Sequence, residues 1–332
     1  MPSATWRKIK RGLLKKNGRA AIGIGKVAYS LPKKRTLRIS VIVCTFNRCE
    51  SLRQTIDSLA LMSVPADLEW ELIVVDNNSN DDTAKLVRQL QRNGSLPIRY
   101  VFEKRQGLGF ARNQGISAAK GEILAFTDDD CIVDAKWLCS IRREFLADPN
   151  LGGLGGKIEL YDPKDKPTTI RPFTDRIQFS SAQLFYLVAG CNMIFRREVF
   201  DIVGKFDPDF TGCAGLVADD TDFIYRVHRQ GFKIIYSPEV IVFHNHGRRT
   251  HEQIRELHKG YLRGRGGFYC KHVLAGDRHV LKMAYWEITP LLKGCLKKVC
   301  FLQSPKEEAS VIAHLATGAA REFMNRCRSL SR

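Results

Sequence analysis

Three consecutive carboxylates, Asp128, Asp129 and Asp130, follow a short apolar run at residues 123–126. The run is apolar without alternation, which predicts a buried strand of a parallel sheet, and ligands of open α/β sheets bind at the carboxyl ends of such strands. Adjacent carboxylates raise one another's pKa, and a divalent cation removes that conflict. Because hard oxygen ligands suit Mg²⁺ or Mn²⁺, the triplet predicts a site for one of these ions.

The alternative for the same stretch is a solvated acidic turn, or the start of a helix that Asp134 caps. A calcium loop of the EF-hand type is excluded, because no glycine stands at the sixth position and no glutamate at the twelfth.

Polar side chains also stand at the ends of other predicted elements. Asp76, His244 and His246 come directly after apolar runs, and the pair Asp219-Asp220 opens a predicted helix. A doubly wound topology brings such strand ends into one crevice. Carboxylate and imidazole groups can share a metal there, and a separate carboxylate can act as a general base. The spacing leaves both histidines open as the metal ligand.

The elements that must position these residues alternate between strand and helix in the first half of the chain. Strands are expected at 38–44, 71–75, 98–102 and 123–126, with helices at 51–62, through Leu86 and Leu90, and at 107–119. This alternation predicts βαβ units and an α/β fold, Rossmann-like, with a mostly parallel sheet flanked by helices. Glycine motifs at 23–25 and 107–112 are incomplete, so neither predicts dinucleotide binding.

The second half is more irregular. It is expected to contain helices at 134–145, 196–203 and 218–229, strands at 152–160, 190–195, 233–236 and 240–243, an irregular segment at 161–188, and mostly helix at 251–332. We therefore divide the chain into a basic segment at 1–36, a catalytic domain at 37–247 and a helical C-terminal extension at 248–332.

The net charge of +18 over 332 residues is concentrated at the two ends of the chain. Residues 1–38 carry +12 and residues 247–332 carry +10, whereas residues 39–246 carry −4. Basic ends can meet nucleic acid or an anionic membrane face. A nucleic-acid-binding protein does not explain an acidic body with carboxylates at strand ends, so we expect no nucleic-acid partner.

Apolar and basic residues are interleaved in both end segments. Trp6, Ile9 and Leu13 share a helical face, and the region 251–332 mixes aromatic, aliphatic and cationic side chains. Each segment predicts attachment to an anionic membrane surface, against the alternatives of a disordered tail and an ordinary helical lid. No secretory signal and no apolar run of 18 residues is visible, and the ten dispersed cysteines fit a reducing compartment. The expected location is cytoplasmic, peripheral on the inner face of the membrane.

The order of motifs resembles family 2 glycosyltransferases of the A-type fold, in particular members that assemble bacterial polysaccharides and glycoconjugates. The matching segments are Val41–Arg48, Val74–Ser79, Ala111–Gly115, Gly121-Glu122, Asp128–Asp130, Gly190–Met193, Gly204–Asp207 and Ala218–Asp222. Together they span roughly residues 38–247. The sequence departs from the family pattern at Asp219, where glutamate is usual, and at Ala218, where glycine is common.

The resemblance implies site residues by position. It places the metal at Asp130 and His244, the catalytic base at Asp220, and acceptor-side residues at Asn192 and Asp219. Nucleotide-sugar contacts are implied for Thr45, Asn47, Arg48, Asp76, Asn78, Arg112, Asn113, Asp128 and Asp129. Plainer alternatives are turn-forming roles for Asn47 and Asp76, a helix cap for Asp220, a strand-end histidine at 244 and a surface ion pair for Arg112.

The implied reaction is inverting transfer of a sugar from a nucleotide-diphosphate sugar, with a UDP-sugar as the expected donor, to a hydroxyl of a glycan or lipid-linked acceptor. Asp220 takes the proton, and Mn²⁺ or Mg²⁺ neutralises the departing diphosphate. The rival enzyme, a nucleotidyltransferase, needs a glycine-rich loop after the first strand, and residues 45–50 contain no glycine.

Overall fold

Parallel strands form one half of the central sheet. The structure, a computed structural model, describes residues 37–210, 216–300 and 303–330, so the expected N-terminal helix lies outside the described residues. Strand β1 (Ile39–Thr45) lies between β2 (Trp70–Asp76) and β4 (Ile123–Asp128), and β3 (Ile98–Phe102) borders β2. All three pairings are parallel, as the β-branched apolar runs predict. Their register sets Thr45 beside Asp76 and Cys44 beside Asp128 at one edge of the sheet.

The other half of the sheet mixes both directions. Strand β8 (Asn192–Arg196) runs antiparallel to β4 and to β6 (Leu151–Leu160), and β6 pairs in parallel with β9 (Lys233–His244). Two short strands, β5 (Cys131–Val133) and β7 (Ile177–Gln178), join β9 in antiparallel pairings. The expectation of a mostly parallel sheet therefore describes the first half, and the second half is mixed.

Strand β9 corrects the prediction of two separate strands. Residues 233–244 form one strand, and its pairing with β6 shifts register after Gly156 and Ser237. Pro238 falls in the shifted stretch, where a residue without an N–H costs no ladder hydrogen bond. The register of the pairing shifts around Pro238, but the strand continues. Its last residue, His244, therefore lies at the same edge of the sheet as the carboxylates.

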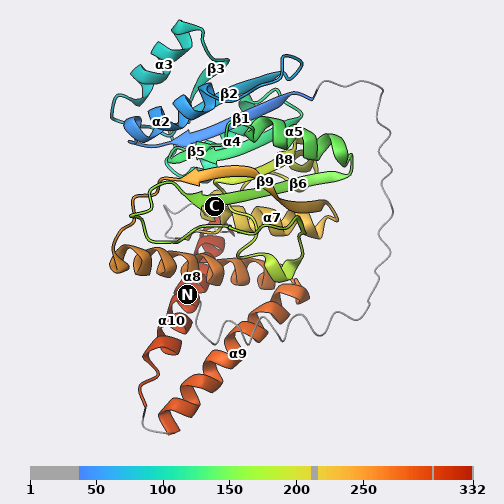
Figure 1. Cartoon of the computed structure of the whole chain (residues 1–332). Helices are drawn as coiled ribbons and strands as arrows, with labels where there is room; N and C mark the ends of the chain where they lie inside the picture. Colours follow the sequence, from blue (N-terminus) through green and yellow to red (C-terminus); the bar gives the residue numbers. More distant parts are fainter. Residues whose placement is uncertain (1–36, 211–215, 301–302, 331–332) are drawn as a thin grey trace.

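Helices cover both faces of the sheet (Figure 1). The first half supplies α2 (Cys49–Ala60), α3 (Thr83–Asn93) and α4 (Leu108–Ala118); the second supplies α5 (Trp137–Ala147), α6 (Arg197–Val203) and α7 (Asp219–Arg229). Helix α5 begins three residues later than expected, because Asp134 forms a turn whose carboxylate accepts the Lys136 amide at 2.8 Å. Residues 161–188 are irregular as predicted, apart from β7 and the 3₁₀ turn Ser181–Gln183. A further 3₁₀ turn, Pro208–Phe210, precedes α7.

Three long helices follow the sheet: α8 (His251–Leu274), α9 (Arg278–Cys300) and α10 (Lys306–Leu330). Helix α8 crosses beneath the body, whereas α9 and α10 project away from the sheet in the view of Figure 1. Phe268 of α8 is fully buried and packs edge-on against Tyr225 of α7. Within the described residues, no helix has both the length and the apolar composition that crossing a bilayer requires.

Glycines let α8 approach its neighbours at backbone distance. A Cβ built at Gly264 would lie 2.2 Å from the carbonyl oxygen of Val217, just before α7. One turn away, a Cβ at Gly260 would meet only a Val217 methyl group, at an ordinary 3.7 Å. The glycine-rich part of α8 therefore has a packing role at position 264.

We expect Gly264→Ala to destabilise the fold by about 1–3 kcal/mol, because the rigid Val217 backbone must move to admit the methyl group. Gly260→Ala on the same helix is the matched control. It should be neutral, or stabilising by up to ~1 kcal/mol through helix propensity. Urea unfolding of both variants measures the difference; equal stabilities would contradict the close contact.

Candidate active site

The acid triplet closes β4 at the edge of the sheet. Asp128 ends the strand with a side chain 35% exposed, whereas the carboxylates of Asp129 and Asp130 are buried. The Arg48 Nη1 donates to Asp129 Oδ1 at 3.0 Å and to Asp130 Oδ2 at 2.8 Å. Burial raises the pKa of Asp129 to about 6, although the Arg48 charge opposes the rise. A solvated acidic turn is therefore excluded, because two of the three acids lie inside the protein.

His244 joins Asp130 from the end of β9. Its Nε2 lies 3.1 Å from Asp130 Oδ1, and its Nδ1 lies 3.1 Å from the hydroxyl of Thr169, which fixes the ring. Burial favours a higher pKa for Asp130, but His244 and Arg48 outweigh it and lower that pKa to about 2. Burial likewise disfavours charge on His244, but Asp130 reverses this effect and raises the pKa of His244 to about 9.

The two histidines have different surroundings. The Nδ1 of His246 accepts the backbone N–H of Arg248 at 3.0 Å and lies 3.4 Å from Asp165. His244 is thus the histidine that the fold brings to Asp130, a choice that spacing left open.

The donor set at this point fits a divalent cation. Ligand atoms of Asp130, Cys131 and His244 lie within 4.8 Å of one another, all in buried residues. Asp130 Oδ1 is buried yet receives no hydrogen bond of good geometry. Neighbouring ligands of an octahedral ion with bonds of about 2.1 Å are about 3 Å apart, which matches the separation between Asp130 and His244. The Thr169 hydroxyl can accept a hydrogen bond from the other ring nitrogen of His244, and such a bond fixes the ring of a metal-bound histidine.

The predicted nucleotide side lies at the ends of β1 and β2. Asp76 is buried; its Oδ1 accepts the Ser79 amide at 2.9 Å and its Oδ2 accepts the Tyr100 hydroxyl at 2.7 Å. Asn47 and Asn78 both have positive φ, at 53° and 66°. The side chain of Asn47 accepts the backbone N–H of Asn80 at 2.7 Å, which ties the two loops together. Asp76 and Asn47 therefore make the backbone hydrogen bonds that turn-forming roles require. Thr45 is buried beside Asp76.

Two predicted contact residues, Asn113 and Asn192, make hydrogen bonds within the fold. Asn113 donates to the Phe206 carbonyl at 2.8 Å and accepts the Phe206 amide at 3.0 Å, so both ends of its amide are used. Asn192 is fully buried, donates to the carbonyls of Lys157 and Val240, and accepts from the Trp137 indole. The structure thus gives both amides hydrogen bonds within the fold, and the predicted substrate contacts of Asn113 and Asn192 stay predictions.

Arg112 links the acid triplet to α7. It is buried, its Nη1 pairs closely with Asp219, and its Nη2 lies 3.5 Å from Asp128 Oδ1. Burial disfavours its charge, but Asp219 and Asp128 outweigh burial and raise the pKa of Arg112 above its usual value. A Cβ at Gly190 would lie 2.5 Å from the guanidinium, so only glycine leaves room for it there. The surface ion pair considered for Arg112 is therefore a buried one.

Asp220 stands in the first turn of α7 with its carboxylate held by backbone. Its Oδ2 accepts the Gly190 N–H at 2.9 Å, and its Oδ1 accepts the Thr221 N–H at 2.6 Å. Neighbouring Asp219 is engaged by Arg112, and burial raises the pKa of Asp219 to about 6 against that ion pair. Of Asp219 and Asp220, only Asp219 pairs with a cationic side chain among the described residues.

Asp222 has a structural role. It is fully buried and receives His272 Nε2 at 2.9 Å, Lys271 Nζ at 2.9 Å and Arg226 Nε at 2.8 Å. Burial opposes its ionisation, but these groups outweigh burial and hold the pKa of Asp222 below its usual range. Because His272 and Lys271 belong to α8, Asp222 fastens the catalytic helix to the C-terminal extension.

A cavity of about 220 Å³ joins these groups. Asp128, Asp219, Asp220 and His244 all line it, which gathers residues from β4, α7 and β9. Sequence reasoning missed four further polar lining residues: Thr169, Arg171, Tyr261 and Arg265. Thr169 and Arg171 come from the irregular segment, which carries no motif. Tyr261 and Arg265 share one face of α8 by their spacing of four residues, the one signal that was available.

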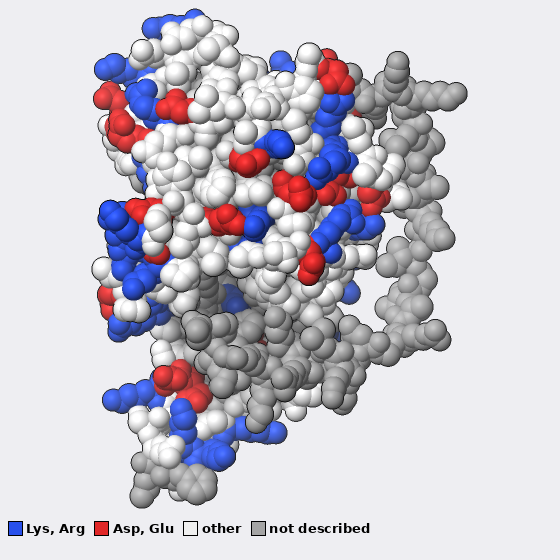
Figure 2. Space-filling view, in the orientation of Figure 1, with Lys and Arg blue, Asp and Glu red and all other residues white. Residues whose placement is uncertain are grey.

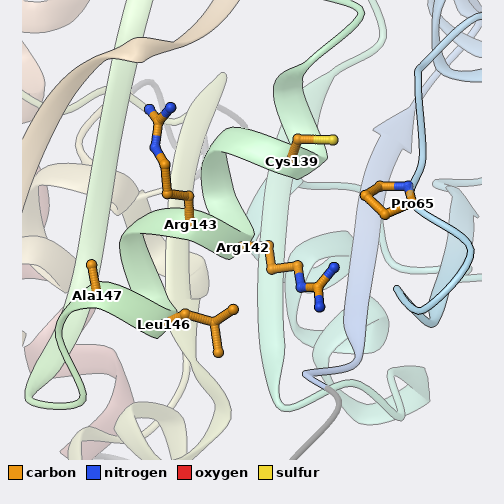
Figure 3. A pocket seen from close by; sticks show the side chains of 6 residues that line it. All are labelled: Pro65, Cys139, Arg142, Arg143, Leu146 and Ala147. Carbon is orange, nitrogen blue, oxygen red and sulfur yellow. The ribbon is translucent and has the colours of Figure 1, made fainter.

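A second hollow lies on the outer side of α5 (Figure 3). Its lining residues are Pro65, Cys139, Arg142, Arg143, Leu146 and Ala147. Arg142 and Arg143 extend in different directions from the helix (Figure 3), and Arg142 is paired with Asp67. None of the residues discussed above as catalytic lines this hollow.

Comparisons with known proteins agree with this geometry. The family model for glycosyl transferase family 2 matches residues 40–204. The succinoglycan biosynthesis protein ExoM of Rhizobium meliloti is 30% identical over 272 residues, which cover 80% of this chain and 83% of that protein. The hyaluronan synthase of Pasteurella multocida is 27% identical over 243 residues, but the chain spans 24% of its length.

Solved structures share the fold. A mannosyltransferase from Pyrobaculum calidifontis, in complex with GDP-Man and Mn²⁺, gives a TM-score of 0.61 at 19% identity, covering 97% of this chain and 94% of that one. Residues 1–349 of S. aureus TarS, in complex with UDP-GlcNAc, give a TM-score of 0.50 at 21% identity, covering 61% of this chain and 56% of that one. With motifs, fold and relatives in agreement, this chain is a glycosyltransferase that belongs to family 2 and has the A-type fold.

Proposed function

We propose that the protein is a metal-dependent, inverting glycosyltransferase that moves a sugar from a nucleotide-diphosphate sugar to a hydroxyl of a glycan or lipid-linked acceptor. The observation that carries the proposal is the shared cavity, in which Asp220 faces the same space as Asp128 and His244. Family membership favours this reaction over the nucleotidyltransferase and nucleic-acid-binding alternatives. The GDP-Man and UDP-GlcNAc complexes of the structural neighbours support a nucleotide-sugar donor, with UDP-sugars as our first choice.

The size of the cavity indicates which part of the substrates it takes. Whole ligand sites usually have ~300–1,000 Å³, and this one has about 220 Å³. We infer that it holds the donor sugar and the reacting hydroxyl. The nucleotide then lies over the loops at Asn47 and Asp76, outside the enclosed space, where the parallel strands end.

In the proposed step Asp220 accepts the proton of the acceptor hydroxyl as oxygen attacks the sugar carbon. The Gly190 and Thr221 amides keep its carboxylate in place. Asp219 remains bound to Arg112 and is not free to attack the sugar, which favours direct displacement with inversion. Asp130 and His244 would hold Mn²⁺ or Mg²⁺, which supplies positive charge for the departing diphosphate.

We also propose that α9 lies on an anionic membrane surface at the inner face of the cell membrane. Its exposed apolar residues recur at spacings of four, seven, four and three: Leu281, Tyr285, Leu292, Leu296 and Val299. Exposed lysines flank this stripe at Lys282, Lys293 and Lys297. On the face shown in Figure 2, Lys and Arg side chains gather where α9 and α10 meet. An apolar stripe with flanking cations fits the boundary between headgroups and acyl chains, and a surface of this kind would bring the enzyme to lipid-linked acceptors.

The proposed domain division follows from these roles. Residues 37–247 would form the catalytic domain, and residues 248–332 an extension that closes the cavity with Tyr261 and Arg265 and carries the membrane-binding helix.

Replacing the base tests the reaction. Asp220→Asn keeps the size of the side chain but cannot take the proton, so turnover should fall by about 10²–10⁴ while donor binding persists. The measurement is sugar transfer with radiolabelled donor, alongside donor affinity for the same variant. If Asp220→Asn turned over normally, the base would have to be Asp219, since Asp222 is fully buried and already bound by Arg226, Lys271 and His272.

Replacing the metal ligand tests the donor site. A thermal-shift panel of UDP-, GDP- and dTDP-sugars, with and without Mn²⁺, should show stabilisation that needs the metal, since a ligand that binds only the folded state stabilises it. Asp130→Ala should abolish the metal-dependent shift. Glu159→Ala, a carboxylate whose side chain is 38% exposed and paired with Lys157, is the control and should keep it. A shift that survived in Asp130→Ala would place the metal elsewhere.

Vesicle binding tests the membrane proposal. The protein should co-sediment with anionic but not neutral liposomes, and less at high salt, because exposed charges are screened beyond roughly 10 Å at 0.1 M. Leu296→Glu should weaken binding by tenfold or more, since burying a leucine contributes about 1.5–3 kcal/mol. Leu146→Glu, at another exposed leucine, on α5, is the control. Equal recovery in the supernatant with both lipids at low salt would rule the attachment out.

A further inference from the structure

The charged groups around the catalytic cavity are not all paired. Three arginines line it: Arg112, Arg171 and Arg265. Arg112 pairs with Asp219 and Asp128, and Arg265 pairs with Glu287 of α9 at 2.7 Å. Arg171 makes no ion pair with any carboxylate in the described residues; its Nη1 donates to the Ile170 carbonyl at 2.9 Å. Its Nε is buried and has no acceptor among those residues.

Arg171 is held by a fixed backbone. Its N–H donates to the Ile158 carbonyl at 2.8 Å, and its carbonyl accepts the Ile158 N–H at 3.3 Å, which joins the segment to β6. The same carbonyl accepts the Tyr236 hydroxyl at 2.7 Å. The guanidinium is therefore presented to the cavity from the edge of the sheet, although the segment around it is irregular.

Tyr261 approaches the same space from α8. Over a third of the residue is exposed, and burial, with the Asp220 charge adding, raises the pKa of Tyr261 to about 12. The hydroxyl thus stays protonated and can donate a hydrogen bond into the cavity that Asp220 and Arg171 also line.

A partly buried arginine without a counter-ion costs free energy unless a ligand supplies the charge. Its planar fork suits carboxylate and phosphate oxygens, which it can bind through two parallel hydrogen bonds. A neutral hydroxyl acceptor would give Arg171 no such partner. We propose that the acceptor carries an anionic group, a phosphate or a carboxylate, which Arg171 and Tyr261 bind while the reacting hydroxyl faces Asp220. This inference rests on the proposed function and narrows its acceptor to an anionic one.

The donor diphosphate is the other source of such an anion. Arg171 lies with Thr169, Phe185 and Tyr261 on the wall made by the irregular segment and α8. Arg48 and Asp76 do not line this cavity, whereas Asp128 at the end of β4 does, and the Thr169 hydroxyl lies 3.1 Å from His244. We take the acceptor as the source because Tyr261, beside Arg171 on this wall, comes from α8 and not from a strand end, and the experiment separates the two.

The test uses the full chain with UDP and Mn²⁺ present, so that the donor side is filled. Binding of three probes is measured by calorimetry: methyl glucuronide, glucose 1-phosphate and the neutral methyl glucoside. The two anionic sugars should bind at least tenfold more tightly than the neutral one, because a hydrogen bond to a charged group is worth about tenfold to hundredfold in affinity. Arg171→Gln should remove that preference, Arg171→Lys should keep part of it, and Tyr261→Phe should weaken it.

Arg143→Gln, at an exposed arginine of α5, is the matched control and should leave all three affinities unchanged. Unfolding midpoints show whether each variant is folded. If Arg171→Gln does not fold, Arg171→Lys replaces it in the comparison. Equal affinities for anionic and neutral sugars in the wild type, including no binding of either, would overturn the proposal. So would a loss of UDP affinity in Arg171→Gln with the sugar preference intact, since the arginine would then serve the donor. Failure of UDP itself to bind counts against the proposed donor; the three sugars are then compared without it.

Discussion

The buried pairing of Arg112 with Asp219 and Asp128 is the interaction on which the site depends. It joins α4, which follows the third parallel strand, to the end of β4 and to the first turn of α7. Removing one partner of such a group leaves a buried charge uncompensated, which typically costs about 3–5 kcal/mol. The catalytic helix is therefore placed relative to the strand ends by electrostatics as much as by apolar packing, and Gly190 is required so that the guanidinium fits.

Several carboxylates lie close together at one edge of the sheet, and different groups offset their mutual repulsion. Arg112 serves Asp219, Arg48 serves Asp129 and Asp130, and His244 meets the remaining oxygen of Asp130. Asp220 alone in this group is stabilised by backbone N–H donors at a helix N-terminus, where the helix dipole favours an anion. An acid stabilised by fixed amides can take up a proton without breaking an ion pair, and this distinguishes a base from its paired neighbours.

Much of the fold follows from the sequence because the parallel strands are uninterrupted apolar runs. An uninterrupted apolar run does not reveal strand direction, because an antiparallel strand buried on both faces, such as β8, has the same pattern as a parallel one. Pro238 led to the prediction of two strands where the structure has the single strand β9. Candidate site residues at strand ends could be predicted because clustered carboxylates and histidines are visible in the sequence. The hydrogen bonds of Asn113 and Asn192 within the fold could not be predicted, because the sequence does not distinguish an amide that binds a ligand from one that binds backbone. Arg171 lies in a segment without periodicity, so only the folded chain shows that it reaches the cavity.

The C-terminal helices are connected to the candidate active site by direct contacts. Asp222 of α7 is bound by two residues of α8, Gly264 brings α8 against the backbone before α7, and Tyr261 closes the cavity. Helix α9 is in turn tied to α8 through the pair of Arg265 and Glu287. A surface that holds α9 would therefore fix the direction in which the cavity opens, because each link from α9 to Asp220 is a buried or charge-paired contact. If α9 attaches to a membrane as proposed, the attachment would also orient the wall that carries Arg171, because that wall is built partly by α8, to which α9 is paired.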